Sequence, residues 1–130
     1  MGGGEPEGQG GQIDPGTLKV VATVPLLKGN PAQVAFGEGF VWVTDTADNS
    51  VTRIDPSSGG GTTIDAVGDG PVGVAAGNGA AWVANGRDGT VAEIDPRSAK
   101  VVKRFTLGAS LSPDGVAVTA GAVWVTVHSP

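Results

Sequence analysis

Short apolar runs, separated by clusters of glycine, asparagine and aspartate, alternate along most of the chain. A typical run is Phe40-Val41-Trp42-Val43, which is rich in β-branched and aromatic residues and is followed by the polar segment 45–50. Such runs, bounded by turn-forming residues, are typical of β-strands, and no segment keeps the 3.6-residue period of an amphipathic helix. The pattern therefore predicts an all-β fold with minimal helix.

Three sequence markers recur with a period of about 40 residues, which is the signature of a repeat architecture. Ile-Asp-Pro begins at Ile13, Ile54 and Ile94. Trp-Val begins at Trp42, Trp82 and Trp124, and each of these tryptophans follows a proline by 11 positions. Because all three markers keep the same phase, they define one repeating structural unit.

Aligned on these markers, each unit divides into four strands. First strands are expected at 32–36, 72–76 and 115–118, and second strands at 40–44, 80–84 and 122–126. Third strands are expected at 51–54 and 91–94, and fourth strands at 18–24, 62–67 and 100–107. Several strands are apolar at consecutive positions, which is expected when both faces of a sheet are covered, as in blades stacked around an axis.

The predicted fold is a partial β-propeller of antiparallel four-stranded blades, with about three blade equivalents in residues 13–130. Residues 1–12 are predicted to be a disordered, glycine-rich tail. Closed propellers have about four to eight blades, so three leave apolar faces and strand edges uncovered. A homo-oligomer, in which 18–24 completes a blade begun by 115–118 and 122–126 of another copy, and a segment of a larger propeller both stay open. The third strand of the composite blade would fall mostly in the glycine-rich tail.

The repeat also resembles a known family. Residues Pro71–Ala75, Gly79–Asn85, Asp88–Val91 and Ile94–Pro96 resemble the YVTN-type repeats of bacterial β-propellers, and the resemblance covers residues 13–130. This broad group includes the streptogramin B lyases and propeller modules of sensory kinases. Since function varies widely within it, the resemblance implies the fold and not a particular activity.

The lyases of this group use magnesium with catalytic His and Glu residues on blade loops, and their second strand typically continues into an aromatic-Thr-Glu segment. Here the corresponding segments are Val43-Thr44-Asp45, Val83-Ala84-Asn85 and Val125-Thr126-Val127, none of which contains Glu. Only His128 lies near such a loop. We therefore expect a binding or interaction module with no cofactor, and a magnesium ion only if the lyase-like reading holds. A lyase-like enzyme and the sensor domain of a kinase or receptor are the alternatives.

Two repeated residue types are interpreted as structural. Asp14, Asp55 and Asp95 of the Ile-Asp-Pro segments precede a proline with preset φ, which is typical of a turn rather than of a carboxylate triad. The three tryptophans recur at one position of an apolar strand, so we expect them to pack between neighbouring blades.

A binding site is predicted on the loops that join fourth to first strands and second to third strands, because both open on the same end of a propeller. The polar residues of these loops differ between repeats, as binding residues on a repeating scaffold do. These loops hold Lys28, Asn30, Asp45, Thr46, Asp48, Asp69, Asn85, Arg87, Asp88, Ser110, Ser112 and His128. The predicted binding residues are Asn30, Asp45, Thr46, Asn85, Arg87 and His128, contacting a small molecule or a protein.

Charge and composition narrow the classes of partner. The net charge is −5 without a run of basic residues, which argues against a nucleic-acid partner. The chain has no cysteine, so it has no disulfide or thiolate chemistry, and its compartment stays undetermined. No signal peptide or membrane-spanning run is recognised, so a soluble chain is expected.

Overall fold

The computed structural model describes residues 9–14, 19–25, 31–108 and 110–128. These residues form twelve strands and no helix, which confirms the predicted all-β fold. No helix in this part of the chain is therefore long and apolar enough to cross a membrane.

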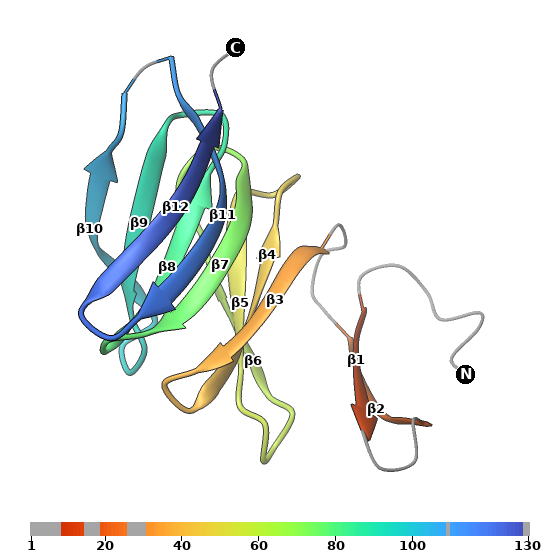
Figure 1. The fold of residues 1–130 in the computed structure, drawn as a ribbon. Coiled ribbons are helices and arrows are strands. Elements are labelled where there is room, and N and C mark those ends of the chain that lie inside the picture. The colour runs from red at the N-terminus through yellow and green to blue at the C-terminus, as the bar shows by residue number, and fades with distance from the viewer. Residues whose placement is uncertain (1–8, 15–18, 26–30, 109, 129–130) are drawn as a thin grey trace.

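Two complete four-stranded antiparallel sheets form the centre of the molecule (Figure 1). The first comprises β3 (Pro31–Gly37), β4 (Phe40–Asp45), β5 (Ser50–Ile54) and β6 (Gly61–Ile64). The second comprises β7 (Pro71–Gly77), β8 (Ala80–Asn85), β9 (Thr90–Asp95) and β10 (Lys100–Thr106). Each sheet pairs its strands in chain order, which confirms the predicted meander. We call these sheets blade A (β3–β6) and blade B (β7–β10).

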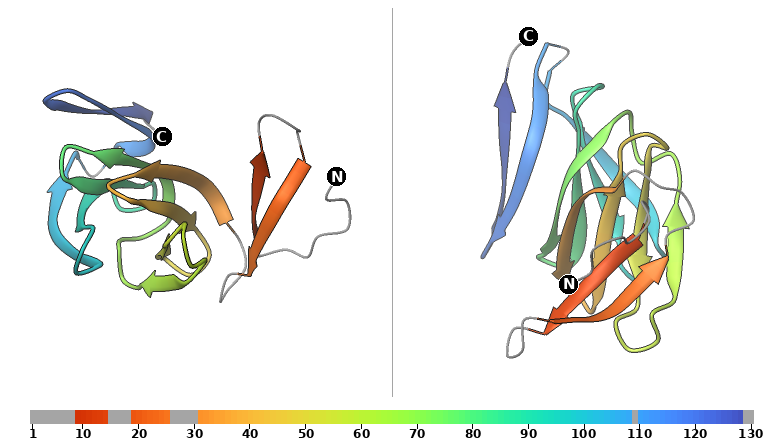
Figure 2. Two further views of the ribbon diagram at one scale, coloured as in Figure 1. Left: turned by 90° about the horizontal axis from the view of Figure 1, so that it is seen from below. Right: turned by 90° about the vertical axis from the view of Figure 1, so that its right-hand side faces the viewer.

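Two hairpins flank the blades. β11 (Ser112–Thr119) pairs with β12 (Ala122–His128), and β1 (Gln9–Asp14) pairs with β2 (Lys19–Pro25). Figure 2 shows β11–β12 against blade B and β1–β2 at the opposite end of the row. The arrangement is a partial β-propeller with twelve strands, the equivalent of three blades.

The strand β1 lies partly within the segment predicted to be a tail. Gln9–Gln12 of the predicted 1–12 tail are strand residues, and only residues 1–8 of it lie outside the described chain. A strand ladder is made by backbone N–H and C=O groups, which glycine supplies like any other residue. Because glycine has no side chain, Gly10 and Gly11 do not add to the apolar pattern from which strands were predicted, so this strand was not recognised.

The hydrophobic core lies between blades A and B. Blade A contributes Trp42, Val51, Ile64 and the neighbouring Val67, and blade B contributes Val74, Ala81, Val83, Ala92 and Ile94. Alternate residues of each strand meet across this interface, since successive side chains point to opposite faces of a sheet. The indole Nε1 of Trp42 donates a hydrogen bond to the Gly37 carbonyl (3.1 Å), so the buried ring has its polar group satisfied.

The three tryptophans do not share the predicted environment. Trp42 is 0% exposed, Trp82 is half-buried, and Trp124 is 63% exposed. The predicted packing between blades is therefore right for Trp42 and wrong for Trp124 in the single chain. The physical reason is strand alternation: Val123 and Val125 face blade B, so Trp124 between them points away from it, where no further sheet of the described chain covers it.

The turns follow the sequence signals. The hairpins after β3 and β7 have two successive residues with positive φ, Glu38 (55°) with Gly39 (85°) and Asn78 (52°) with Gly79 (83°). This is the geometry of a type I′ turn, which matches the twist of the flanking strands.

Inner strands of successive blades lie close to each other. A Cβ atom placed on Gly73 of β7 would lie 2.2 Å from the Asp114 carbonyl oxygen of β11. Only glycine permits this approach, so Gly73 sets how closely the β11–β12 hairpin packs on blade B.

Candidate functional site

The loops at one end of the blades are joined by side chain to backbone hydrogen bonds. Thr46 Oγ1 donates to the Pro71 carbonyl at 2.7 Å, and the Gly70 N–H donates to Asn49 Oδ1 at 2.9 Å. Ser112 Oγ donates to the Gly86 carbonyl at 2.7 Å, which links β11 to the loop after β8. We call this end, made by residues 45–50, 65–70, 85–89, 107–108 and 110–114 with His128, the loop rim.

Asn85 of the predicted site has a structural position. It is 0% exposed, and its Nδ2 donates to the Val67 carbonyl (3.3 Å) and to Thr90 Oγ1 (3.1 Å). A Cβ atom on Gly68 would overlap the Asn85 amide at 2.2 Å, so the loop after β6 closes directly over this side chain. Asn85 anchors that loop and presents no surface to a ligand.

Asp45 and Thr46 are also engaged in the fold. Asp45 is 5% exposed, and its Oδ1 accepts a hydrogen bond from the Asp48 N–H at 3.2 Å. Asp45 thus fixes the β4–β5 loop internally, whereas the Thr46 hydroxyl, which donates to the Pro71 carbonyl, holds that loop against the next blade.

Arg87 belongs to an exposed charged cluster. Its Nη1 lies 3.2 Å from Asp69 Oδ1, and the two side chains are 60% and 52% exposed. Asp88 accepts a hydrogen bond from the Asp69 N–H through Oδ2 at 2.9 Å. The backbone of Asp69 is thus held by blade B, while both charged side chains face the solvent.

His128 lies at the same end, on the last residue of β12. Its Nε2 is 3.8 Å from Asp114 Oδ2, and both side chains are about two thirds exposed. Such an exposed ion pair contributes little to stability. Because both side chains are exposed, they are accessible to a partner. The predicted residues Asn30 and Lys28 lie outside the described residues.

Charge on the loop rim is unbalanced. Among the described residues, its exposed carboxylates are Asp48, Asp65, Asp69, Asp88 and Asp114, whereas its exposed basic side chains are Arg87 and His128, joined by Arg104 of β10, which donates to the Ala66 and Val67 carbonyls of the rim. The rim thus has a negative excess at neutral pH. No group of three or more potential metal ligands lies together in the described residues.

The turn role predicted for the repeated aspartates is confirmed for two of them. Asp55 Oδ1 accepts hydrogen bonds from the Ser57 N–H (2.9 Å) and hydroxyl (2.8 Å), and Asp95 Oδ2 accepts one from the Ser98 hydroxyl (2.8 Å). These hydrogen bonds favour the charged carboxylates and lower the pKa of both groups below their usual value. The side chain of Asp14 lies outside the described residues.

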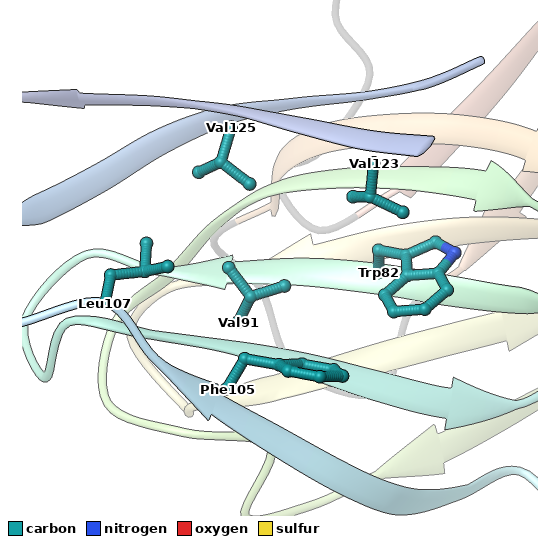
Figure 3. A pocket seen from close by; sticks show the side chains of 6 residues that line it. All are labelled: Trp82, Val91, Phe105, Leu107, Val123 and Val125. Carbon is teal, nitrogen blue, oxygen red and sulfur yellow. The ribbon is translucent and has the colours of Figure 1, made fainter. Parts of the chain in front are cut away.

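An apolar groove between blade B and the β11–β12 hairpin was not predicted from the sequence. Its volume is about 260 Å³, and its walls are Trp82, Val91, Phe105, Leu107, Val123 and Val125 (Figure 3). Val123 and Val125 correspond in the repeat to Ala81 and Val83, which are both 0% exposed in the sealed interface between blades A and B. The repeat alignment could therefore have predicted that Val123 and Val125 face blade B from a sheet with too few strands to close the interface.

Consecutive four-stranded meanders that stack face to face, with inner strands side by side, define a β-propeller. The chain matches no known protein family and no protein of curated function. Its structural likeness is to propellers of low sequence identity, which shows the fold alone.

Three solved structures illustrate the likeness. Hydrazine synthase from Kuenenia stuttgartiensis is 21% identical, with a TM-score of 0.72 over 88% of this chain. A streptogramin B lyase is 18% identical (TM-score 0.69 over 81%), and the WD40 β-propeller domain of Doa1 is 18% identical (TM-score 0.67 over 83%). In each case the match covers 37% of the other chain, so this chain spans little more than a third of their length.

Proposed function

We propose that the chain is a binding or interaction module of the β-propeller type, related to the YVTN-type bacterial repeats, and that it contacts its ligand or partner through the loop rim. The observation that carries the proposal is the contrast within the rim. Its backbone is fixed by hydrogen bonds between successive blades, while Asp69, Arg87 and Asp88 keep exposed charges and His128 keeps an exposed imidazole. A rigid scaffold with exposed polar groups binds with little loss of conformational entropy.

The negative excess of the rim indicates the chemistry of the partner. Among the described residues, five exposed aspartates outnumber Arg87, Arg104 and His128, so a cationic group, such as a lysine or arginine side chain, is favoured electrostatically. Of the predicted site residues, Arg87 and His128 are exposed beside Asp69 and Asp114, the carboxylates that would bind the cationic group, whereas Asp45, Thr46 and Asn85 support the loops. No observation within the described residues favours the lyase-like or the sensor alternative over this one.

The test is a two-dimensional NMR titration of the ¹⁵N-labelled chain with tetralysine and, separately, with tetraglutamate. Tetralysine is expected to shift the amide signals of residues 65–70, 85–89 and 110–114, and tetraglutamate is not. Raising the salt to about 1 M should abolish the shifts, since exposed charges are then screened within about 3 Å.

A matched pair of variants makes the test specific. Asp69→Asn should weaken tetralysine binding, whereas Glu38→Gln, which removes an exposed carboxylate at the opposite end of the blades, should not. Shifts centred on the turns at 38–39 and 78–79, or an equal effect of both substitutions, would contradict the proposal.

A further inference from the structure

Within the described residues, β12 and β1 have a free edge although the corresponding strands of a complete blade are paired on both sides. β12 pairs only with β11, and β1 pairs only with β2. In the complete blade B, the second strand β8 pairs with both β7 and β9. β12 therefore lacks a third strand, and β1, if it is a third strand, lacks a second one. Such edges present free N–H and C=O groups and readily pair with another strand.

The β1–β2 hairpin has the register of a third and a fourth strand. In blade B the pairs Glu93–Lys103 and Ile94–Val101 leave Val102 as an extra residue, and in the hairpin Gln12–Ala22 and Ile13–Val20 leave Val21. Every position in the hairpin lies 81 residues before its counterpart in blade B. Since a bulge at the same place is a specific feature of strand pairing, β1–β2 is the outer half of a blade.

The β11–β12 hairpin has the register of a first and a second strand. Val116 pairs with Val125, as Val74 pairs with Val83 in blade B, at a constant offset of 42 residues. The register shift near the start of each first strand is also shared. β11–β12 is thus the inner half of a blade, and the two hairpins are complementary halves.

The two end faces of the row of blades are complementary as well. Val34 and Phe36 on the outer face of blade A are 66% and 67% exposed. Their counterparts in blade B, Val74 and Ala76, pack against the core that contains Trp42. Trp124, the counterpart of Trp42, is 63% exposed at the other end of the row.

We propose that two copies of the chain join head to tail into a six-bladed propeller. β1 of each copy pairs with β12 of the other, so that a composite blade forms from β11–β12 of one copy and β1–β2 of its partner. Trp124 then packs on Val34 and Phe36 of the partner copy, as Trp42 packs on blade B. Six blades lie within the range of about four to eight in which propellers close, and a twofold ring satisfies every copy equally.

The repeat fixes the register between the copies. Transferring the β8–β9 pairing to the composite blade opposes Ile13 to Val123, Gln12 to Trp124 and Gly11 to Val125. Ile13 takes the place that Ile94 has in blade B, where Ile94 is 0% exposed against blade A. Strand β1 therefore lies along the open side of the apolar groove and continues the interface that β11–β12 begins. Within one copy this pairing is prevented, because the two hairpins lie at opposite ends of the row (Figures 1 and 2).

A disulfide test examines the register. The chain has no cysteine, so a chain with Gln9→Cys can be mixed with a chain with Val127→Cys and equilibrated in a glutathione buffer. Paired antiparallel residues lie about 4.5–5.5 Å apart at Cα, which suits a disulfide. The mixture is expected to give a cross-linked pair of chains, in yield several-fold above a control mixture of Gly10→Cys with Val127→Cys, whose side chains alternate to opposite faces. Equal yields, or no cross-link, would overturn the proposed register.

The molar mass in solution, measured by light scattering on the unmodified chain, examines the assembly itself. A mass of two chains is expected, and Phe36→Lys or Trp124→Lys should reduce it to the mass of one chain while circular dichroism stays of the β type. Val102→Lys is the matched control, because Val102 is 58% exposed but lies on the outer strand away from both contacts, and this variant should stay a dimer. A single-chain mass at every concentration, or assemblies without a defined size, would show that a different strand or partner covers these edges.

Discussion

The two inter-blade interfaces of the molecule differ although they are built from the same repeat. Between blades A and B, four strands face four, and Trp42, Val51, Val83 and Ile94 are all fully buried. Between blade B and β11–β12, four strands face two, and a groove of about 260 Å³ stays open beside Trp82. The repeat thus specifies which residues face a neighbour, whereas the number of strands in that neighbour decides whether they are buried.

Arg53 adds polar contacts to the interface between the two complete blades. Its guanidinium lies 4.4 Å from the ring centroid of Phe40 and donates to the carbonyls of Pro96 (2.6 Å) and Arg97 (3.1 Å) in blade B. Two complete blades are therefore joined by polar contacts at the turn end as well as by their apolar core.

The largest expected effect concerns Trp42, in the sealed interface. Trp42→Ala should lower the free energy of unfolding by about 3–5 kcal/mol, because a buried indole leaves a large cavity and a lost hydrogen bond to Gly37. Urea denaturation followed by circular dichroism measures this. A loss below about 1 kcal/mol would mean that the A–B interface is not the core.

An intermediate effect is expected at Trp82, on the wall of the groove. Trp82→Ala, introduced into the single-chain Phe36→Lys background, should cost about 2 kcal/mol, since only part of the ring area leaves water on folding. Its Nε1 donates to the Gly77 carbonyl (3.0 Å), and its ring lies 6.1 Å from that of Phe105. A cost equal to that of Trp42→Ala in the same Phe36→Lys background would show that the groove is closed within a single chain.

A small effect is expected at Trp124 when single chains are compared. Trp124→Ala, introduced into the Phe36→Lys chain, should change the free energy of unfolding by less than about 1 kcal/mol, because the side chain is 63% exposed. If the loss instead approached that of Trp42→Ala, a further part of the chain would have to cover this face.

The smallest expected effect concerns the turn at Asp95. Ser98→Ala should raise the pKa of Asp95 towards its usual value, because the Ser98 hydroxyl is the main group that lowers it. A lowered pKa stabilises the fold above the usual pKa near 3.8, and this contribution is lost as the pH falls through the folded pKa. The variant should therefore lose less stability than the parent on acidification. A ¹³C NMR titration of the Asp95 carboxyl, with Asp55 as internal control, checks the shift.

The sequence predicted the blades because each strand carries a run of apolar residues and each turn carries a residue suited to it. The Ile-Asp-Pro turns and the order of strands in blades A and B follow from local chemistry. Expected strand ends differ by only a few residues from those observed, for example 62–67 against Gly61–Ile64 for β6.

The features that the sequence did not predict depend on contacts between distant residues. The burial of Asn85 is due to the loop that closes over it at Gly68, and its loop position alone suggested a ligand contact. The exposure of Trp124 depends on what lies beyond β12, and β1 is formed by residues without informative side chains. The position of a residue in the repeat predicts which face of the sheet its side chain points to, whereas the neighbouring sheet decides whether that side chain is buried.

The burial of each tryptophan is measured most directly by acrylamide quenching of its fluorescence. The chains compared keep one tryptophan, with the other two replaced by phenylalanine. In the Phe36→Lys background, quenching should be weakest for Trp42, intermediate for Trp82 and strongest for Trp124. In the unmodified background, Trp124 should become protected while Trp42 stays unchanged. Equal quenching of all three residues in the Phe36→Lys background would contradict the claim that the neighbouring sheet, and not the repeat itself, decides burial.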